Sequence, residues 1–471
     1  MTANCQRWIS ALAMVTGLAF SLPASAFQLE MAQVTVNDTF VTPTVTTVSF
    51  LAPFDTTPVV VTLATNDGGD PANLRIANVT TTGFQIVATE PDANDGPHVA
   101  MTTAYLAVEP GSHTLPDGSQ LQAYAVSTTA SVGRLTSSVW ASLSFTDNFP
   151  AAPAVIANLQ TDNNETGTPP TTSANPFLAT ATRNVSSTGL QYAMERAETT
   201  AGTNNAAETI GIIAVSDGLD LDFVAAIGGA TNLQAVRSGD TIRGFDDGCF
   251  TVGWPAGFAT TPLAVASMNS RDGNNGGWLR RCSQSGSALG LAVEEDIDND
   301  SERNHTTEIA GLFGASNNFH GRFDVGFTVT KTVLTTSDPE NGDTDPFAIP
   351  GASVQYTIEI SNQGSGAPDD DSVTVTDTVP DNLALCVLPS CQAGGSVILD
   401  TSGSPSPPAV TLGTIRYSND GGATFGYSPN PDADGFDAAI NAIEITLDGN
   451  FGALTPAGAP SAQLQITARV N

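Results

Sequence analysis

One spaced pattern occurs three times along the chain and constrains its fold more than any other feature. An aromatic residue is followed four positions later by Phe and four positions after that by Pro, in the frames Phe50–Phe54–Pro58, Phe145–Phe149–Pro153 and Trp254–Phe258–Pro262. Each frame precedes a short apolar stretch, such as Val59–Leu63, whose side chains favour a β-strand. The recurrence of this pattern about every 100 residues predicts three similar β-modules.

The closing segments of the three copies also align without a gap, at residues 98–107, 205–214 and 305–314. One aligned position is held by Glu208 and Glu308 in two copies and by Met101 in the first. We expect a structural polar role at a strand start for the two glutamates, with a shared ligand contact as the alternative. Short strands that alternate with proline turns and polar loops are typical of antiparallel sandwiches. We therefore predict an all-β chain of tandem antiparallel β-sandwiches.

This layout resembles the H-type lectin fold, a six-stranded antiparallel sandwich of invertebrate agglutinins and secreted bacterial proteins. The resemblance covers residues 28–330 and lies in framework positions, namely Phe50 to Pro58, Asn73-Leu74-Arg75, Gly83-Phe84 and Tyr105-Leu106-Ala107. It implies binding of N-acetylgalactosamine-type sugars where the subunits of a trimer meet, but no position here matches the sugar-contacting pattern. Three repeats on one chain suggest the hypothesis that they pack about a pseudo-threefold axis and form a trimer internally.

The pattern changes from about Lys331. Residues 350–362 alternate like a strand after a Pro-Gly turn, and a second such strand at 373–380 ends in Val-Pro. These segments resemble the Ig-like conserved repeat domain of bacterial surface proteins, whose modules commonly serve as stalks or spacers. We thus expect a signal peptide at 1–26, lectin-like repeats at 27–125, 126–233 and 234–330, and an Ig-like domain at 331–471.

The N-terminus predicts export from the cytoplasm. Arg7 precedes an apolar run from Ile9 to Phe20, and the small residues 24–26 follow, which is the pattern of a secretory signal cleaved before Phe27. The run is shorter than the about 20 residues of a membrane-spanning helix, and no later segment approaches that length. No hydrophobic anchor follows the last predicted strand. We expect no membrane span and a secreted, extracellular or cell-surface protein.

The cysteine count agrees with an oxidising compartment. Once Cys5 leaves with the signal, four cysteines remain, Cys249, Cys282, Cys386 and Cys391. We favour two local disulfides, Cys249 with Cys282 and Cys386 with Cys391, because the members of each pair lie in one module. A zinc site is the alternative interpretation, although no Cys-x2-Cys or His-x3-His spacing supports it.

The charge balance is strongly acidic, with 48 Asp and Glu against 15 Lys and Arg, and Lys331 is the only lysine. Nucleic acid is not an expected partner, because its recognition requires clustered cations. The acidic residues are scattered through loops, which favours solubility, also in salty surroundings.

Two segments offer candidate binding residues. Asp296, Asp298 and Asp300 alternate with the spacing of a calcium loop, so calcium is the candidate cofactor. Position six of that loop is Ser301 instead of Gly, so a solvated acidic loop is the competing interpretation. Trp278 follows two glycines in a loop and is the candidate ring for stacking on a sugar, although core or rim packing is the default expectation for it.

The sequence contains no assembled catalytic motif. Four histidines occur without a His-Glu-x2-His pattern, and no Gly-x-Ser-x-Gly is present. We predict an exported, non-enzymatic binding or adhesion protein whose partner is an extracellular glycan or another surface component. A purely structural surface protein and a secreted hydrolase are the alternatives, the latter because catalytic triads assemble in space.

Overall fold

Strands make up nearly all of the regular structure in the described part of the chain. The computed structural model describes residues 26–471, except residues 43, 92–93, 95, 137, 166–175 and 201. The predicted signal peptide therefore lies outside the described residues, apart from Ala26. In the described residues the only helix is a 3-10 turn at Phe245–Asp247, and none is long and apolar enough to cross a membrane. The predicted all-β class is confirmed.

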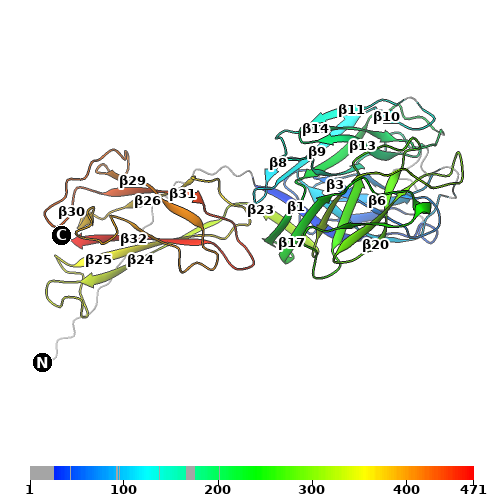
Figure 1. Cartoon of the computed structure of the whole chain (residues 1–471). Helices are drawn as coiled ribbons and strands as arrows, with labels where there is room; N and C mark the ends of the chain where they lie inside the picture. The colour runs from blue at the N-terminus through cyan, green and yellow to red at the C-terminus, as the bar shows by residue number, and fades with distance from the viewer. Residues whose placement is uncertain are drawn as a thin grey trace. The chain divides into compact units, whose positions relative to one another are not determined.

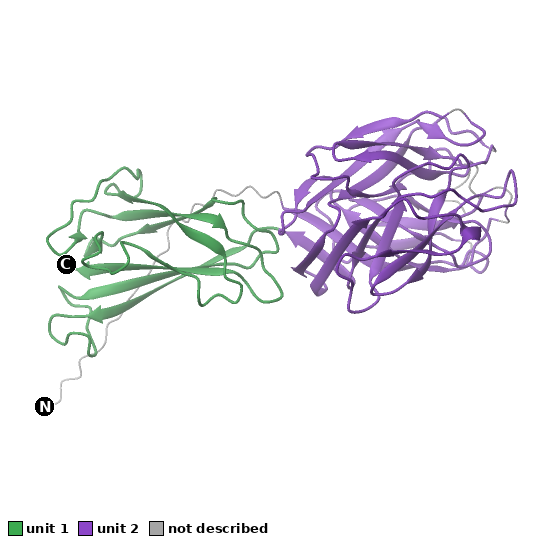
Figure 2. Cartoon of the chain, in the orientation of Figure 1, with its two compact units in different colours: residues 1–24, 324–471 green, residues 25–323 purple. Residues whose placement is uncertain are grey.

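The chain forms two compact units, residues 25–323 and residues 324–471 (Figure 2). We refer to them as the repeat unit and the C-terminal unit. Three boundaries that we expected, 125/126, 233/234 and 330/331, fall inside the strands β9 (Gln120–Thr128), β17 (Gly229–Arg237) and β24 (Phe327–Ser337).

Each repeat has an inner sheet of four antiparallel strands with the same order. Figure 1 labels β1, β3, β8, β9, β17 and β23 among these strands. The orders are β23-β1-β7-β3, β8-β9-β15-β12 and β16-β17-β22-β19. The strands not yet given are β1 (Phe27–Val36), β3 (Val59–Thr62), β7 (Met101–Val108), β8 (Gly111–Thr114), β12 (Ala154–Leu159), β15 (Glu208–Val215), β16 (Asp220–Ala225), β19 (Leu263–Met268), β22 (Ala310–Ala315) and β23 (Phe319–Phe323).

An outer sheet of three strands completes each sandwich. These strands are β2 (Thr46–Ser49), β6 (Gly83–Thr89) and β5 (Asn73–Ala77), then β11 (Ala141–Ser144), β14 (Gly189–Glu195) and β13 (Ala179–Ser186), then β18 (Phe250–Gly253), β21 (Ala288–Glu294) and β20 (Trp278–Gln284). Two short strands pair in parallel with outer strands, β10 (Ser131–Val132) with β14 and β4 (Ala64–Thr65) with β20. The β4–β20 pair joins the first repeat to the third.

Strand β23 joins the third repeat back to the first. It pairs with β1 in a register that places Phe323 opposite Phe27 and His320 opposite Glu30. In the other two inner sheets the corresponding strand, β8 or β16, forms a hairpin with the strand that follows it. The first inner sheet therefore obtains its fourth strand from the end of the repeat unit, which protects an otherwise open edge.

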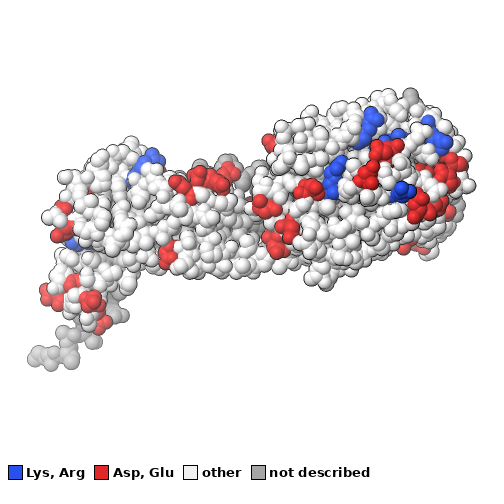
Figure 3. Space-filling model, viewed as in Figure 1, with Lys and Arg blue, Asp and Glu red and all other residues white. Residues whose placement is uncertain are grey.

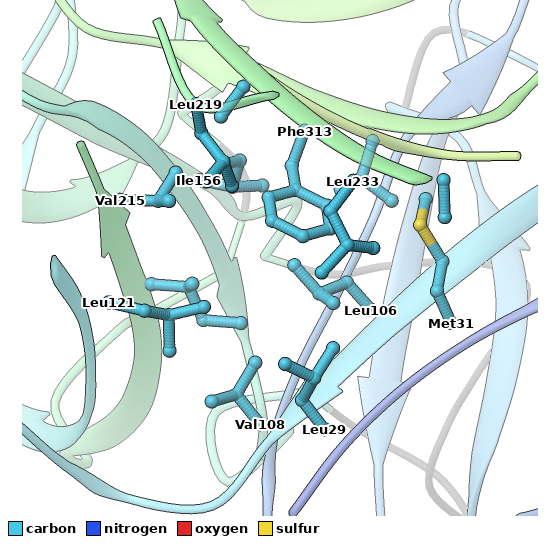
Figure 4. Packing of buried hydrophobic residues seen from close by; sticks show 14 of the residues in the cluster. Leu29, Met31, Leu106, Val108, Leu121, Ile156, Val215, Leu219, Leu233 and Phe313 are labelled. Atoms are coloured by element: carbon cyan, nitrogen blue, oxygen red, sulfur yellow. The ribbon is translucent and has the colours of Figure 1, made fainter. Parts of the chain in front are cut away.

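A single apolar core is shared by the three inner sheets. Figure 4 shows side chains of all three repeats directed into it, and those labelled are Leu29, Met31, Leu106, Val108, Leu121, Ile156, Val215, Leu219, Leu233 and Phe313. A second core fills each sandwich and contains the aromatic pair of its frame, so the predicted aromatic plugs do lie in cores. This arrangement is what the hypothesis of an internal trimer predicts.

Side-chain amides extend the contact between the inner strands of adjacent repeats. The Val60 N–H donates to Gln160 Oε1 (2.9 Å), and Gln160 Nε2 donates to the Val60 oxygen (2.6 Å). Asn269 makes the same pair of bonds with Val155 (3.0 and 2.7 Å). Gly311 permits this approach, because a Cβ there would lie 2.5 Å from the Val155 nitrogen and oxygen.

The C-terminal unit is a separate two-sheet sandwich. One sheet has the order β24-β25-β32-β27-β30 with β28 beside β32, and the other has the order β26-β31-β29. Its strands are β25 (Ser353–Asn362), β26 (Val373–Thr378), β27 (Leu383–Cys386), β28 (Ile398–Asp400), β29 (Ala409–Ser418), β30 (Phe436–Asp437), β31 (Ala442–Asn450) and β32 (Ser461–Val470). Alternate side chains of β25, β26, β31 and β32 fill one apolar core.

Candidate functional site at the repeat interfaces

Buried charges lie where adjacent repeats meet, and each of the three interfaces contains an arginine. We name each interface by the two repeats that meet there. Arg75 lies at interface 1–2, Arg271 at interface 2–3 and Arg280 at interface 3–1. Arg75 on β5 and Arg280 on β20 hold the same register position, which Ala181 occupies on β13. Arg75 and Arg280 belong to the first-named repeat of their interfaces, whereas Arg271 belongs to the second-named repeat of interface 2–3. A residue at a different position within the repeat therefore supplies the cation there.

Interface 1–2 holds a buried ion pair. Arg75 Nε lies 2.9 Å from Glu165 Oε1, and Arg75 Nη2 lies 3.7 Å from Glu208 Oε1. Burial raises the pKa of Glu165 to about 7, although the charge of Arg75 acts in the opposite direction. Near neutral pH this carboxyl group is therefore partly protonated, which reduces the charge buried at the interface.

Interface 2–3 contains a second ion pair and a buried histidine. Arg271 binds Glu195 through two nitrogens, with Nη2 3.2 Å from Oε1. His305 Nδ1 contacts Glu295, and its Nε2 lies 3.0 Å from Glu308 Oε1. Burial lowers the pKa of His305, but the hydrogen bonds with both carboxylates outweigh burial and raise it to about 9. The imidazolium is therefore the main form at neutral pH.

Interface 3–1 is built around Arg280, which is fully buried. Its guanidinium donates to three carbonyl oxygens of the first repeat, those of Thr65, Asp67 and Asp70 (2.7, 2.9 and 2.9 Å). It also donates to Glu294 Oε2 (2.6 Å) within its own repeat. The planar fork of arginine suits several acceptors at once, so this side chain ties a loop of one repeat to a strand of another.

Glu294 balances a second arginine at the same interface. Arg303 Nε donates to Glu294 Oε1 (2.5 Å), and the Arg303 guanidinium lies 3.8 Å from the centre of the Phe245 ring. The carboxylate is completely buried, so two cations are needed to compensate for its lost hydration.

These three arrangements differ in residue type and in bonding. Interface 3–1 uses backbone carbonyls, interface 2–3 a two-nitrogen arginine–glutamate pair beside a histidine that binds carboxylates of its own repeat, and interface 1–2 a less hydrogen-bonded ion pair. Three identical ligand sites do not result from the three similar folds. Each of these arginines contacts a residue of the adjacent repeat and so contributes to cohesion between repeats.

Glu208 and Glu308 both anchor the loop that follows an inner strand. Glu208 accepts from the backbone N–H of Asn164 (2.9 Å), and Glu308 accepts from the backbone N–H groups of Asp272 and Gly273 (2.7 and 3.0 Å). Both carboxylates are fully buried at the start or just before the start of a strand. These contacts fit the predicted structural polar role.

Trp278, the candidate ring for sugar stacking, is buried, in keeping with the default expectation of core packing. Its side chain is only 5% exposed, its Nε1 donates to the Ala72 oxygen (2.9 Å), and its ring centre lies 4.8 Å from that of Phe177. Gly276 and Gly277 adopt positive φ angles and turn the chain inward, so the ring enters a contact among all three repeats. It offers no open face to a sugar in this structure.

The acidic segment 296–300 directs its carboxylates to different partners. Asp296 is buried and accepts from the backbone N–H groups of Glu198 and Asp298 (2.7 and 3.1 Å), whereas Asp300 lies 3.3 Å from Arg134. Burial raises the pKa of Asp296 to about 7. Among the described residues no three His, Cys, Asp or Glu side chains gather as metal ligands. Calcium binding at this segment stays a prediction.

The structure contains both disulfides in the pairing that the sequence favours. Cys249 is bonded to Cys282, and Cys386 is bonded to Cys391. The first lies in the third repeat and the second in the C-terminal unit. They strengthen the inference of an oxidising compartment.

The sequence analysis missed the buried arginines and one strand position. Glu30, Gln122 and Gln234 correspond on β1, β9 and β17, and each accepts a backbone N–H from the turn of its aromatic frame, for example from Leu51 (2.9 Å). Glu30 additionally binds His320 (2.8 Å) of the closing strand. A polar residue in an apolar strand, repeated in all three copies, is the signal that could have revealed this position.

Acidic side chains form several separate clusters on the visible surface of the repeat unit, basic side chains lie beside some of them, and most of the visible surface is neither (Figure 3). Several of the few arginines are buried or largely buried at the three interfaces. Buried carboxylates outnumber the buried arginines, but the excess of acidic residues in the sequence still leaves an acidic surface, which disfavours anionic partners.

Comparison with known proteins gives one similarity. The chain is 25% identical to Halomucin from Haloquadratum walsbyi over 381 residues, which is 80% of this chain and 4% of Halomucin. The chain thus spans only a small part of the length of that protein. No family model and no solved structure matches the chain.

Proposed function

We propose that this protein is an exported, non-enzymatic binding or adhesion protein that acts at or outside the cell surface. The observation that carries the proposal is the shared core, which joins three similar sandwiches into one body and so holds three similar sets of loops in fixed positions. Rigid presentation of several loops is a common basis for recognition, because the scaffold reduces the entropy lost on binding.

Two further observations support a place outside the cytoplasm. Both disulfides are typical of oxidising compartments, and the similarity to Halomucin favours a surface-associated protein. The C-terminal unit would act as a spacer or docking module in this proposal.

Exposed apolar side chains indicate which loops would contact a partner. In the loop after β1, Phe40 is 56% and Val41 79% exposed, and in the loop after β9, Leu135 is 50% and Val139 57% exposed. Apolar groups exposed in corresponding loops of two repeats are candidates for contact with a glycan face or a surface component. The proposed partner is an extracellular glycan or another surface component, as the sequence analysis predicts.

The experiment is binding of residues 27–471 to a glycan array and to isolated envelope material. We expect saturable binding that Phe40→Ser with Val41→Ser, and separately Leu135→Ser with Val139→Ser, weaken at least several-fold. Ile227→Ser is the control, because Ile227 is a similarly exposed apolar residue in the β16–β17 hairpin. Equal binding by all variants would remove the loops from the proposal.

A purely structural surface protein is the second candidate. It is favoured by the interfaces themselves, because the resemblance to H-type lectins implies sugar sites where subunits meet, and buried ion pairs of this chain occupy those places. The absence of any saturable ligand, combined with surface localisation by immunolabelling, would favour this candidate over the first.

A further inference from the structure

Strand β24 forms a long open edge of the C-terminal unit. It covers Phe327–Ser337 and pairs with β25 alone. From residue 328 to residue 336, the described residues offer its backbone no hydrogen-bond partner outside β25. A neighbour in an antiparallel sheet binds only every second residue of a strand, so the remaining N–H and C=O groups of β24 point away from its sheet. This side of β24 is therefore a template for a further strand.

The repeat unit covers several of its own strand edges. Gln160 binds both backbone groups of Val60 on β3, and Asn269 binds both of those of Val155 on β12. Strand β23 covers the free side of β1. Contacts of this kind prevent a strand edge from pairing with another chain.

The other edges of the C-terminal unit are short, irregular or charged. β30 and β28 have only two and three residues, and β26 has six and contains Asp377. β29 has ten residues, but its register shifts between Leu412 and Ile415, and Arg416 follows with a side chain that is 53% exposed. Short lengths, bulges and charges are the usual protection of a sheet edge.

β24 lacks this protection over most of its length. Its register with β25 is unbroken over residues 327–335, and this stretch contains no Pro, Gly, Asp or Glu. Its one charged side chain, Lys331, is 11% exposed and is paired with Asp377. Val333 and Leu334 are 45% and 64% exposed. A long, regular edge with exposed apolar side chains is the kind that pairs with another strand.

A second copy of this chain fits the edge by charge and by sequence. Asp and Glu outnumber Lys and Arg by 48 to 15, so two copies repel each other at most contacts. β24 contains no acidic residue, and a second acidic copy can approach it with less repulsion. Thr328, Thr330, Thr332 and Leu334 alternate along the strand and are exposed, so one uncharged face of β24 is free for pairing.

We propose that two copies of this chain associate through β24, as antiparallel neighbours about a two-fold axis at Thr332. An axis of this kind makes both copies contribute the same residues. Thr332 lies opposite its own counterpart, and Thr330 lies opposite Leu334 of the second copy. Pairs of threonines, and of threonine with an apolar side chain, stabilise neighbouring strands. The exposed Leu334 side chain thereby gains a neighbour.

The position of the axis follows from the single lysine. An axis at Lys331 would place two ammonium groups opposite each other, which destabilises a strand pair. With the axis at Thr332, each Lys331 lies opposite Val333 of the second copy and keeps its contact with Asp377. One strand pair is a small interface, so the association is weak and reversible. This inference does not depend on the proposed function.

The test is sedimentation velocity of residues 27–471 over a range of protein and salt concentrations. We expect a monomer–dimer equilibrium that becomes stronger as salt screens the repulsion between copies. Thr332→Glu and Thr332→Lys each place two like charges at the axis and should reduce the dimer below detection. An equimolar mixture of these two variants should restore the dimer, because opposite charges then lie opposite each other.

Thr411→Glu is the matched control, because Thr411 is an exposed threonine on β29, the other long edge of this unit. It should dimerise like the wild-type protein. A wild-type protein that stays monomeric at every concentration would overturn the proposal. So would a dimer that Thr332→Glu leaves intact, a dimer that Thr411→Glu removes equally, or a mixture of the Thr332 variants that stays monomeric.

A cysteine at the axis tests the register. The four cysteines of residues 27–471 are bonded in pairs, so an added thiol has no free partner within its own chain. Thr332→Cys should form a disulfide-linked dimer on mild oxidation, because opposite residues of antiparallel strands have Cα atoms about 4.5–5.5 Å apart, within disulfide range. Thr330→Cys should crosslink to Leu334→Cys but not to itself. Equal crosslinking of Thr330→Cys alone and Thr332→Cys on a non-reducing gel would contradict this register.

Discussion

The two units of this chain place charge in their interiors in different ways. The repeat unit buries ion pairs at each interface between repeats, and Arg280 and Glu294 have no exposed surface at all. The C-terminal unit has an apolar core, with one lysine–aspartate pair beside it. Both are β-sandwich structures, so the fold class does not explain the difference.

The difference follows from the number of modules that must be joined. A single sandwich buries one face of each sheet and leaves its loops in water. Three sandwiches that share a core also press loops and strand ends together, where the backbone groups need partners. The arginines meet this need with donors that reach several acceptors, as Arg280 does with three carbonyl oxygens. The buried arginines of the repeat unit therefore help to hold its three repeats together.

The largest expected effect tests whether the three repeats unfold as one. Phe313 lies in the shared core and Phe451 in the core of the C-terminal unit, and neither is exposed. Truncation of either to alanine should cost about 3–5 kcal/mol. In calorimetry, Phe313→Ala should lower the transition of the whole repeat unit, and Phe451→Ala only that of the C-terminal unit. Survival of two repeats in Phe313→Ala would show that the core does not couple them.

The next effect compares two interfaces. Arg280→Met should destabilise the repeat unit by about 3–5 kcal/mol, because the fully buried Glu294 carboxylate and three carbonyl oxygens lose a donor. Arg75→Met should cost less, about 1–3 kcal/mol, because the raised pKa of Glu165 lets that carboxyl group take up a proton. Denaturant unfolding at pH 7 measures both. Equal losses would mean that the interfaces contribute alike despite their different bonding.

The third effect is a pH dependence that comes from His305 and its two carboxylate partners in the third repeat. The pKa of His305 is raised from 6.5 to about 9 in the folded protein, so its contribution is complete below pH 6.5 and is lost as the pH rises through about 9. The wild-type protein should exceed His305→Gln in stability by an amount on the order of 1–3 kcal/mol at pH 6, and by little at pH 10.

His113→Gln is the matched control for that titration. His113 is also buried, but burial lowers its pKa, so its native interactions favour the neutral ring. The stability difference between the wild-type protein and this variant should not decrease between pH 6.5 and 9. A decrease of the same size in both variants would argue against a specific role of the His305 carboxylates.

The smallest effect concerns the closing strand pair. Glu30→Gln should cost about 1 kcal/mol or less, because glutamine holds the corresponding position in the other two repeats and keeps an acceptor for the Leu51 N–H. Glu30→Ala should cost about 1–3 kcal/mol, because that N–H and His320 lose their partner. Thermal unfolding of the two variants compares them. A large loss for Glu30→Gln would show that the closure depends on charge.

Prediction from the sequence succeeded where short-range patterns carry the information. The aromatic frames, the all-β class and the disulfide pairs depend on residues within one module. The sequence left two interpretations of Trp278 open, because its neighbours Ala72 and Phe177 come from the other two repeats. A glycine-rich local sequence indicates a turn, but it does not indicate what the turn faces.

By itself the sequence determined the local features of this protein. These are strands with alternating faces, aromatic core residues at fixed spacing, four cysteines in two modules, and a strongly acidic charge. Only the tertiary structure decided which side chains meet. The pairing of Glu30 with His320 spans 290 residues, and Arg280 reaches carbonyl groups more than 200 residues away. The physical reason is that alternation along a strand specifies which face is buried, whereas the partner of that face is chosen by packing between modules, at distances along the chain that no local pattern records.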